Sequence, residues 1–385
     1  MKRGLGRDAN QRAALAITRS LGRRGFHVVT ADTVPETLAG ASRHASIGVT
    51  YPSPYCAPND FLARISEIVQ QYAIDIVLPV TDVTTFLLVK NPDAIPCVLP
   101  CPSFESYELL SNKYRLFQLA IKLGLAIPRT IFLEKGSQAA ENSIDMAFPL
   151  VVKPFRSKIL EDGSFISTSV MIAHDRAELL HLLADTPYLQ RYPLMLQEYV
   201  IGEGQGLFGL YQQGAPVAFF SHKRVREKPP SGGVSVLSES AILAPGLLDA
   251  ARKLLDAAQW HGVAMVEFKV AADGTPYLME VNGRFWGSLQ LAIDAGVDFP
   301  YLTCQLASAQ RILPPPSYRI GVRSRWLLGD LDRLYLVLKG SQSGMVKLRA
   351  ALQFLNFLAP STYSEINRFS DPMPFFFELK HYLKS

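Results

Sequence analysis

Two strand-like runs, VAMVEFKV and PYLMEVN, place acidic side chains where they could bind a cation. The runs flank Asp273 and Gly274, a pair of residues that favours a tight hairpin turn. If these two residues occupy the centre of the turn, Glu267 lies directly opposite Glu280. The predicted hairpin therefore holds two carboxylates side by side, where like charges repel each other.

The two faces of this hairpin differ in polarity. Side chains two positions apart share a face, so Asn282 and Arg284 lie on the same face as the two glutamates. The other face is predicted to be core, and it carries Val266, Phe268, Met279 and Val281.

A bound cation would relieve the repulsion between the glutamates. At about 5 Å and an effective dielectric constant of ~20, that repulsion is on the order of 3 kcal/mol. Mg²⁺ suits the site because it prefers carboxylate oxygens and shares its remaining positions with phosphate and water. Asn282 adds a neutral oxygen, and Arg284 adds a planar donor for phosphate. The alternative is a solvated face on which Glu267 pairs with Lys269 or Arg284, and the residues alone leave both interpretations open.

Two lysines are candidates for binding phosphate. Lys153 ends an apolar strand, where a buried ammonium group needs an anionic partner. Lys113 opens a predicted helix, and taken alone it is more typical of a solvated helix start. Its spacing from Lys153 becomes informative only through the family resemblance given below.

The segment Gln197-Glu198-Tyr199-Val200 has the character of a flexible ligand-binding edge. It ends a predicted strand and runs into the glycine-rich residues 201–206. A backbone of this kind can approach a flat ligand such as adenine closely. A plain glycine-rich turn is the alternative.

A basic strand end could bind an anion. Arg224 and Arg226 precede Ser231-Gly232-Gly233, a loop whose N–H groups could surround a negatively charged group. Exposed basic residues without a ligand are the alternative here.

The elements that must position these residues fall into two patterns. The N-terminal part alternates helical and apolar strand-like segments, which predicts a parallel α/β sheet. The middle part predicts an α+β region, in which Ser111 or Asn112 caps a helix that Gly124 ends. The predicted helices are 11–21, 60–72, 113–123, 175–184 and 246–258, and the predicted strands are 27–31, 74–80, 149–153, 194–200, 207–212 and 216–222.

The composition narrows the functional class. Of 385 residues, 48% are hydrophobic and 19% charged, which predicts a globular chain of two to three domains. Lys and Arg total 39 against 34 Asp and Glu, and this small excess does not favour nucleic-acid binding. The chain has no run of 18 apolar residues, so no membrane partner is expected. The four scattered cysteines are predicted to be reduced, and the protein to be cytoplasmic.

Taken together, five motifs resemble the ATP-grasp superfamily in their order and spacing. The resemblance is closest to the branch with carbamoyl-phosphate-synthase-like chains and carboxylate-amine ligases, and it covers roughly residues 1–310. It implies a Rossmann-like pre-ATP-grasp domain (1–112) and a two-subdomain ATP-grasp domain (113–310) with a lid near 130–200. Residues 311–385 are predicted to be a helical extension that packs on the body or forms an oligomer contact. The motifs are Lys113, Val152-Lys153-Pro154, Gln197-Glu198-Tyr199-Val200, Val266-Glu267-Phe268 and Met279-Glu280-Val281-Asn282-Gly283-Arg284.

The resemblance implies a role for each candidate residue. The protein would be an ATP-dependent ligase that activates a small-molecule carboxylate as an acyl phosphate, for attack by an amine or similar nucleophile. Its cofactors would be ATP and Mg²⁺ or Mn²⁺. The nucleotide would be held by Lys113, Lys153, Gln197, Glu198, Val200 and Glu203, the metal by Glu267, Glu280 and Asn282, and the reacting groups by Arg284, Arg224 and Arg226, with Asp82 lining the same cleft.

Two features depart from the family pattern. Family lid loops are often glycine-rich, yet Gly163 is the only glycine between Lys153 and Val170. The first strand of the N-terminal unit is expected to be missing, because only Met1 to Arg3 precede Gly4, which would indicate a misassigned start or a truncation.

Two other functions remain open. Gly4, Gly6 and Ala9 fit G-x-G-x-x-A, and Asp32 follows at the end of a strand, which would suit an NAD-dependent oxidoreductase. That hypothesis leaves Glu267 and its neighbours unexplained. The other alternative is an ATP-binding module without catalytic activity, which the glycine-poor lid would favour.

Overall fold

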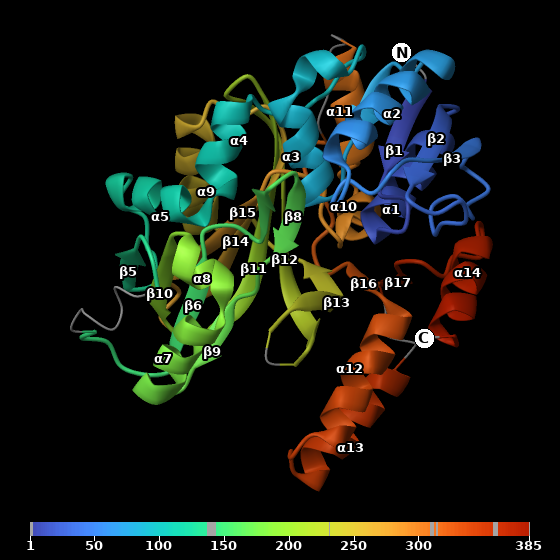
Figure 1. The fold of residues 1–385 in the computed structure, drawn as a ribbon. Coiled ribbons are helices and arrows are strands. Elements are labelled where there is room, and N and C mark those ends of the chain that lie inside the picture. The colour runs from blue at the N-terminus through green and yellow to red at the C-terminus, as the bar shows by residue number, and fades with distance from the viewer. Residues whose placement is uncertain are drawn as a thin grey trace.

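The N-terminal unit is a parallel sheet with helices on both faces (Figure 1). The computed structural model describes residues 3–136, 144–230, 232–308, 312, 315–356 and 361–384. The strand order is β3-β2-β1-β4. The strands are β1 (Arg3–Arg7), β2 (His27–Asp32), β3 (Ile47–Thr50) and β4 (Ile76–Leu78), and the helices are α1 (Arg12–Gly22), α2 (Pro58–Gln71) and α3 (Asp82–Lys90), followed by a 3-10 turn at Pro92–Ala94.

Alternation of apolar residues along β2 explains the two-sided packing. Val28 contacts the core shared with α1, whereas Val29 contacts the core shared with α2 and α3. The predicted parallel α/β sheet is therefore confirmed. The expected absence of the first strand is wrong, because β1 occupies the centre of the sheet and pairs with both β2 and β4.

The second unit is a small antiparallel sheet with its own apolar core. It follows α4 (Phe104–Ser111) and α5 (Lys113–Lys122), and Asn112 caps α5 by accepting a hydrogen bond from Arg115 N at 3.3 Å. The strand order is β5-β10-β6-β9. Its elements are β5 (Thr130–Leu133), β6 (Leu150–Pro154), β9 (Met171–Ala173), α7 (Arg176–Asp185), α8 (Pro187–Arg191) and β10 (Leu194–Glu198).

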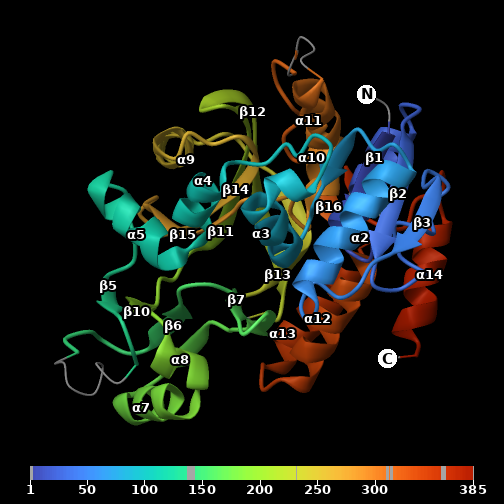
Figure 2. The same ribbon diagram turned by 45° about the horizontal axis from the view of Figure 1, so that its top comes forward.

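The segment expected to be a glycine-poor lid loop forms a hairpin. Strands β7 (Lys158–Glu161) and β8 (Ser164–Ser167) pair antiparallel, and Asp162 and Gly163 between them both have positive φ, 49° and 78°. Positive φ at two successive residues is the geometry of the tight turns that suit hairpins. Figure 2 shows β7 lying between the small sheet and α3.

A seven-stranded sheet carries the facing glutamates. Its order is β15-β14-β11-β12-β13-β16-β17, antiparallel except for the last pair. One face packs on α9 and the other on α10, α11 and α1. The elements are β11 (Glu203–Gln212), β12 (Ala215–Lys228), β13 (Val234–Ser240), α9 (Pro245–Ala257), β14 (Gly262–Val270), β15 (Pro276–Asn282), α10 (Leu289–Ala295), α11 (Phe299–Ala307), β16 (Arg323–Arg325) and β17 (Thr362–Ser364).

The sequence predicted a helical C-terminal extension, whereas the structure has strands as well as helices in this region. Strands β16 and β17 extend the large sheet, and the helices α12 (Leu327–Lys339), α13 (Gly344–Leu355) and α14 (Met373–Tyr382) surround this edge. Helices α12 and α13 pack on each other, and α14 lies beside the N-terminal sheet (Figures 1 and 2). Phe375 and Phe377 pack against the core that contains α1. None of the helices in the described residues is both long and apolar enough to cross a bilayer.

Candidate active site

The β14–β15 hairpin brings the two glutamates face to face. Glu267 pairs with Glu280, and Met265 pairs with Asn282, as predicted. The turn itself differs from the prediction, because Gly274 N bonds to Ala271 O and the last strand pair is Val270 with Pro276. A bulge after Glu267 corrects the register by one residue.

The bulge also changes the environment of Met279. Leu278, rather than Met279, lies opposite Phe268 and is fully buried in the core. Met279 instead lines a cavity against β6 and β10. The expectation that Met279 is a core residue is therefore wrong, since an extra residue in one strand turns the next side chain to the other face.

The two carboxylates are embedded in hydrogen bonds and ion pairs. Asn282 Nδ2 donates to Glu267 Oε1 at 3.2 Å and to Glu280 Oε1 at 3.0 Å. Lys113 Nζ lies 2.9 Å from Glu280 Oε2, and Arg224 pairs with Glu267. Lys113 lowers the pKa of Glu280 well below its usual range despite burial, whereas burial raises the pKa of Glu267 against the effect of Arg224. The site therefore balances both negative charges with cations from other elements.

Lys153 is a buried cation with no anionic partner. Its side chain is 8% exposed, and no ion pair or hydrogen bond to its ammonium group occurs within the described ranges. The ring of Phe117 lies 5.3 Å from Nζ. Burial and the charge of Lys113 lower the pKa of Lys153 to about 8, although Glu280 acts in the opposite direction. An ammonium group in this state favours an anionic ligand.

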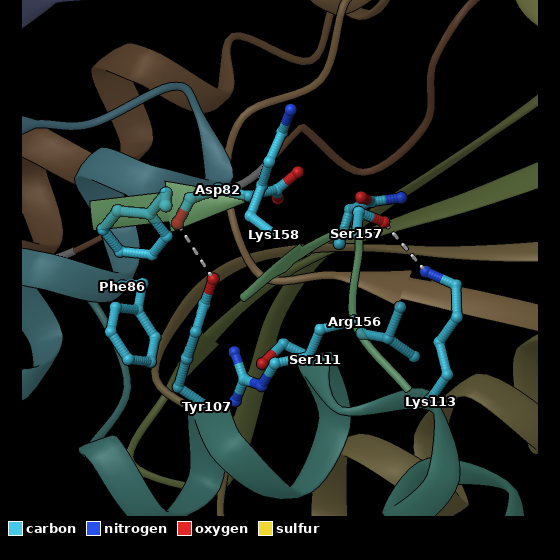
Figure 3. Close-up of a pocket in the computed structure, with 11 residues that line it drawn as sticks. Asp82, Phe86, Tyr107, Ser111, Lys113, Arg156, Ser157 and Lys158 are labelled. Carbon is cyan, nitrogen blue, oxygen red and sulfur yellow. Dashed lines mark hydrogen bonds between the residues drawn. The ribbon is translucent and has the colours of Figure 1, made fainter. Parts of the chain in front are cut away.

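One cavity beside these residues, here called the lysine cavity, is lined by Lys113, Lys158 and Asn282 (Figure 3). Lys113 Nζ also lies 3.4 Å from Ser157 Oγ, the interaction drawn in Figure 3. Arg156 pairs with Glu108 at the same cavity. Sequence reasoning did not assign Arg156, Ser157 or Lys158, although the basic cluster between Lys153 and Lys158 was a usable signal.

A second cavity of about 190 Å³, here called the hinge cavity, lies between the small sheet (β6, β9 and β10) and the β14–β15 hairpin. The predicted nucleotide residues Lys153, Gln197, Glu198 and Val200 line it, together with apolar side chains. The side chain of Gln197 is fully buried, donates to Thr130 Oγ1 at 2.9 Å and leaves Oε1 without a partner. This lining suits a flat, partly polar ring.

Glu203 does not join the hinge cavity. It begins β11, is exposed, and accepts only a long hydrogen bond of 3.4 Å from Gln205 Nε2 among the described residues. A plain glycine-rich turn was the alternative for residues 201–206, and from Glu203 onward the chain is strand.

A third cavity of about 420 Å³, here called the carboxylate cavity, contains both glutamates, Asn282, Arg224 and Arg284. Arg284 Nε donates to Asp82 Oδ1 at 2.8 Å, and its NH2 donates to Asn282 Oδ1 at 3.1 Å. The structure thus places Asp82 beside Arg284. Gly233 lines this cavity, and Ser231 of the same predicted loop lies outside the described residues.

Two further residues of this cavity were missed. Arg12, at the start of α1, brings a guanidinium group from the N-terminal unit. His222 is buried, and burial together with Arg224 lowers its pKa to about 3, so it is neutral at physiological pH. No spacing motif connects either residue to the hairpin, because tertiary packing alone brings them there.

Arg226 was predicted to act beside Arg224, and the structure does not bring it into the carboxylate cavity. Its NH2 lies 2.8 Å from Asp330 Oδ2, in a different cavity against α12. The cause is an irregularity of β12 between Arg224 and Arg226, which changes the face that the second arginine presents.

The donors present fit Mg²⁺. Glu267 and Glu280 each place a carboxylate oxygen within 3.2 Å of Asn282 Nδ2, and Asn282 would ligate a metal once its amide turned Oδ1 from Arg284 toward the carboxylates. No group of three or more His, Cys, Asp or Glu suited to a metal exists among the residues that the structure describes. A site of two carboxylates is typical of an ion that also binds nucleotide phosphates, rather than one enclosed by protein alone.

Comparisons with known proteins agree with this fold. Residues 192–328 match the family model described as "ATP-grasp in the biosynthetic pathway with Ter operon". The matched range contains both glutamates, Arg224 and Arg284 but neither Lys113 nor Lys153. The arginine-specific large chain of carbamoyl phosphate synthase from Bacillus subtilis (strain 168) is 23% identical over 190 residues. That match spans 47% of this chain and 17% of the relative.

Solved structures share the fold over most of the chain. An L-amino acid ligase from Bacillus licheniformis has a TM-score of 0.63 at 19% identity and covers 82% of this chain and 78% of its own. The ADP complex of the N5-carboxyaminoimidazole ribonucleotide synthetase PurK has a TM-score of 0.65 at 13% identity, covering 91% and 95%. The biotin carboxylase domain of 2-oxoglutarate carboxylase from Hydrogenobacter thermophilus, solved with MgADP, has a TM-score of 0.64 at 13% identity, covering 84% and 73%.

The protein has the fold of the ATP-grasp ligases. The superfamily resemblance inferred from the motifs is thereby confirmed, through the family model and through these structures. Two of these structures were solved with ADP, one of them also with Mg²⁺, which agrees with the predicted cofactors ATP and Mg²⁺.

The dinucleotide-binding alternative does not fit the structure. Gly4 and Gly6 lie inside β1 rather than in the loop that follows it, so they cannot surround a pyrophosphate. The Asp32 carboxylate accepts hydrogen bonds from Asn10 N and Nδ2, at 2.9 and 3.2 Å.

Proposed function

We propose that this protein is an ATP- and Mg²⁺-dependent ligase that activates a carboxylate as an acyl phosphate for attack by an amine or similar nucleophile. The observation that carries the proposal is the unpartnered, buried Lys153 next to the facing glutamates and Lys113. A nucleotide would supply the missing anion for Lys153, and its metal would share the glutamates with Lys113 and Arg224.

The three cavities suggest where the adenine, the phosphates and the substrates would bind. The hinge cavity would hold adenine, with the unpartnered Gln197 Oε1 as an acceptor. The phosphates would lie against Lys113 and Lys158 at the mouth of the lysine cavity, which at about 30 Å³ is too small to enclose them. The carboxylate cavity would hold the acid and its nucleophile. The hinge cavity lies within the proposed domain 113–310, whereas the lysine and carboxylate cavities also include residues of the proposed domain 1–112.

The residues would act by positioning and by neutralising charge. Bound Mg²⁺ would draw negative charge away from the transferred phosphoryl group. Arg284 is held in place by Asp82 and Asn282, so its guanidinium group is already oriented toward the carboxylate cavity. Arg224 reaches the same cavity from β12 and remains charged, since Glu267 raises its pKa. Fixed cations of this kind stabilise developing negative charge without reorganisation.

The relatives suggest substrate classes without deciding between them. The names of the structural relatives include an L-amino acid ligase and a ribonucleotide synthetase. Because these structures are only 19% and 13% identical to this chain, the substrate class proposed here is inferred from the residues of the carboxylate cavity and not from those names. Its arginines favour an anionic substrate.

The proposal is tested by measuring ADP and phosphate release with a panel of carboxylic acids and amines, followed by mass spectrometry of the products. We expect Glu280→Gln to reduce turnover by at least a hundredfold, because one of the two carboxylates for the metal is lost. Glu67→Gln, which changes an exposed glutamate paired with Arg64 on α2, is the control and should retain activity.

Two outcomes would contradict the proposal. Normal activity of Glu280→Gln would exclude the metal assignment. ATP binding without turnover across a broad panel would favour a module without catalytic activity.

A further inference from the structure

A cavity of about 310 Å³ outside the ATP-grasp site contains four arginines. It lies where β12, β13 and β16 meet α12 and α13, the helix pair at the sheet edge in Figure 1. We call it the arginine cavity, and it shares no lining residue with the carboxylate cavity. Its lining includes Arg226, Arg323, Arg325, Arg333, Gln353 and Thr362.

The arginine cavity carries an excess of positive charge. Asp330 Oδ2 is the shared partner of Arg226 and Arg325, each at 2.8 Å, so one carboxylate faces two guanidinium groups. Arg323 pairs with Glu239, but Glu239 also binds Lys223 at 3.1 Å. Arg333 forms no ion pair within the part of the chain that the structure describes. The net charge around Asp330 is therefore about two positive units.

Buried donors in the cavity lack acceptors. Arg226 is 8% exposed; its Nη1 donates to Gln353 O and its Nη2 pairs with Asp330, but its Nε has no hydrogen-bond partner among the described residues. The Nε of Arg333 is also buried without a partner. An unsatisfied buried N–H is costly, and donors of this kind are normally satisfied by a ligand or water. Burial and the neighbouring arginines lower the pKa of Arg226 to about 10, against the effect of Asp330.

We propose that the arginine cavity binds the phosphate group of a small molecule. Planar guanidinium groups bind phosphate with paired hydrogen bonds, and a dianion would balance the excess charge. The volume accommodates a phosphate with a small organic substituent. The ligand is either inorganic phosphate or a phosphate monoester, which share this chemistry. The site does not depend on the proposed ligase activity.

Calorimetry on the full-length protein, at constant ionic strength, tests the proposal with inorganic phosphate and glycerol phosphate as probes. We expect Arg333→Gln to weaken binding by at least fivefold, because the arginine without an ion pair is lost. Arg349→Gln, an exposed arginine on α13 outside the cavity, is the matched control and should bind like the unmodified protein. Tighter binding of the ester than of phosphate would identify a phosphorylated metabolite as the ligand, and equal binding would identify phosphate itself.

Phosphate would also bind near the lysine cavity under the proposed function. The test therefore depends on the part of the phosphate binding that is lost in Arg333→Gln and kept in Arg349→Gln. A crystal soaked in tungstate gives an independent measurement, and we expect an anomalous peak beside Arg226 and Arg333. Equal binding by Arg333→Gln and the unmodified protein would overturn the proposal. Absence of a tungsten peak from the arginine cavity would do the same.

Discussion

Lys153 shows how a single buried charge indicates a ligand. Below pH 8 its ammonium group is charged, 8% exposed and without an anion among the described residues. The charge therefore destabilises the free protein, because the same group is fully hydrated in the unfolded chain. A protein retains such a group when binding a ligand recovers the cost, as activity and stability often oppose each other at functional sites.

We expect Lys153→Met to stabilise the free protein while weakening nucleotide binding. The pKa is lowered from 10.5 to about 8, so removing the charge should raise the free energy of unfolding at pH 7 by about 1 to 3 kcal/mol. Urea denaturation measures this change, and calorimetry with ADP and Mg²⁺ should show at least tenfold weaker binding. Lys122→Met, on the exposed end of α5, is the control.

The same lysine predicts a pH dependence with a definite sign. Between about pH 8 and 10.5 the unfolded chain binds a proton at this position and the folded chain does not, so stability should rise with pH in that window. ADP binding needs the charged form, so its affinity should fall as pH rises above 8. An ADP affinity that stays constant from pH 7 to 9 would contradict this role of Lys153.

At the level of elements, the β14–β15 hairpin shows which structural features local sequence patterns can predict and which they cannot. Alternation and the Asp-Gly pair placed Glu267 opposite Glu280, although the predicted two-residue turn is a five-residue loop (271–275) whose one-residue difference in register the bulge cancels. They were insufficient to predict the bulge that moves Met279 from the core to the hinge cavity. Such a bulge is selected by packing against β6 and β10, which lie far away in sequence.

The β7–β8 hairpin is an element that spans two units. Phe165 on β8 packs edge-on against Tyr55 and Phe86 of the N-terminal unit, with ring centroids 6.3 and 5.7 Å apart. Its backbone N also donates to Tyr55 O at 2.8 Å. Since Lys158 and Phe165 both line the lysine cavity, this contact holds the hairpin beside the proposed phosphate site.

We expect Phe165→Ala to speed nucleotide release by roughly tenfold. Two aromatic pairs contribute about 0.5 to 1.5 kcal/mol each, and 1.4 kcal/mol corresponds to a factor of ten. Stopped-flow release of a fluorescent ADP analogue measures the rate. Ile166→Ala, on the opposite face of the same strand, is the control. Equal release rates for Phe165→Ala and the unmodified protein would show that the hairpin does not retain the nucleotide.

On the scale of the whole molecule, tertiary packing brings residues to the cavities that no sequence motif identifies. The sequence motifs predicted residues that the structure brings to the same cavities, because each motif lies on one short element. Arg12 could not be predicted, because α1 meets the hairpin only in three dimensions. The same holds for Arg226, whose partner Asp330 lies on α12.

The C-terminal region is joined to the N-terminal unit through Arg19 and Asp371. Asp371 is fully buried and accepts hydrogen bonds from Arg19 Nε at 2.8 Å, Ser42 Oγ at 2.7 Å and Arg43 N at 3.0 Å. Arg19 also donates to the carbonyl groups of Glu365, Ile366 and Asp371. One helix of the first unit therefore anchors the segment that precedes α14.

We expect Asp371→Asn to lower the free energy of unfolding by about 3 to 5 kcal/mol, because it leaves the buried guanidinium group of Arg19 without a counter-charge. Burial raises the pKa of Asp371, but its hydrogen bonds from Arg19, Ser42 and Arg43 lower it further, so the net direction is down. The stabilisation is thus complete above about pH 4 and lost as pH falls through the lowered pKa. Urea denaturation at pH 7 and in acid should therefore show a large difference between the two proteins at neutral pH and a smaller one in acid.

Asp249→Asn is the matched control, since the exposed pair of Asp249 with Lys253 on α9 is worth less than about 0.5 kcal/mol. Equal denaturation midpoints for Asp371→Asn and Asp249→Asn would mean that the Arg19–Asp371 ion pair does not hold the C-terminal region.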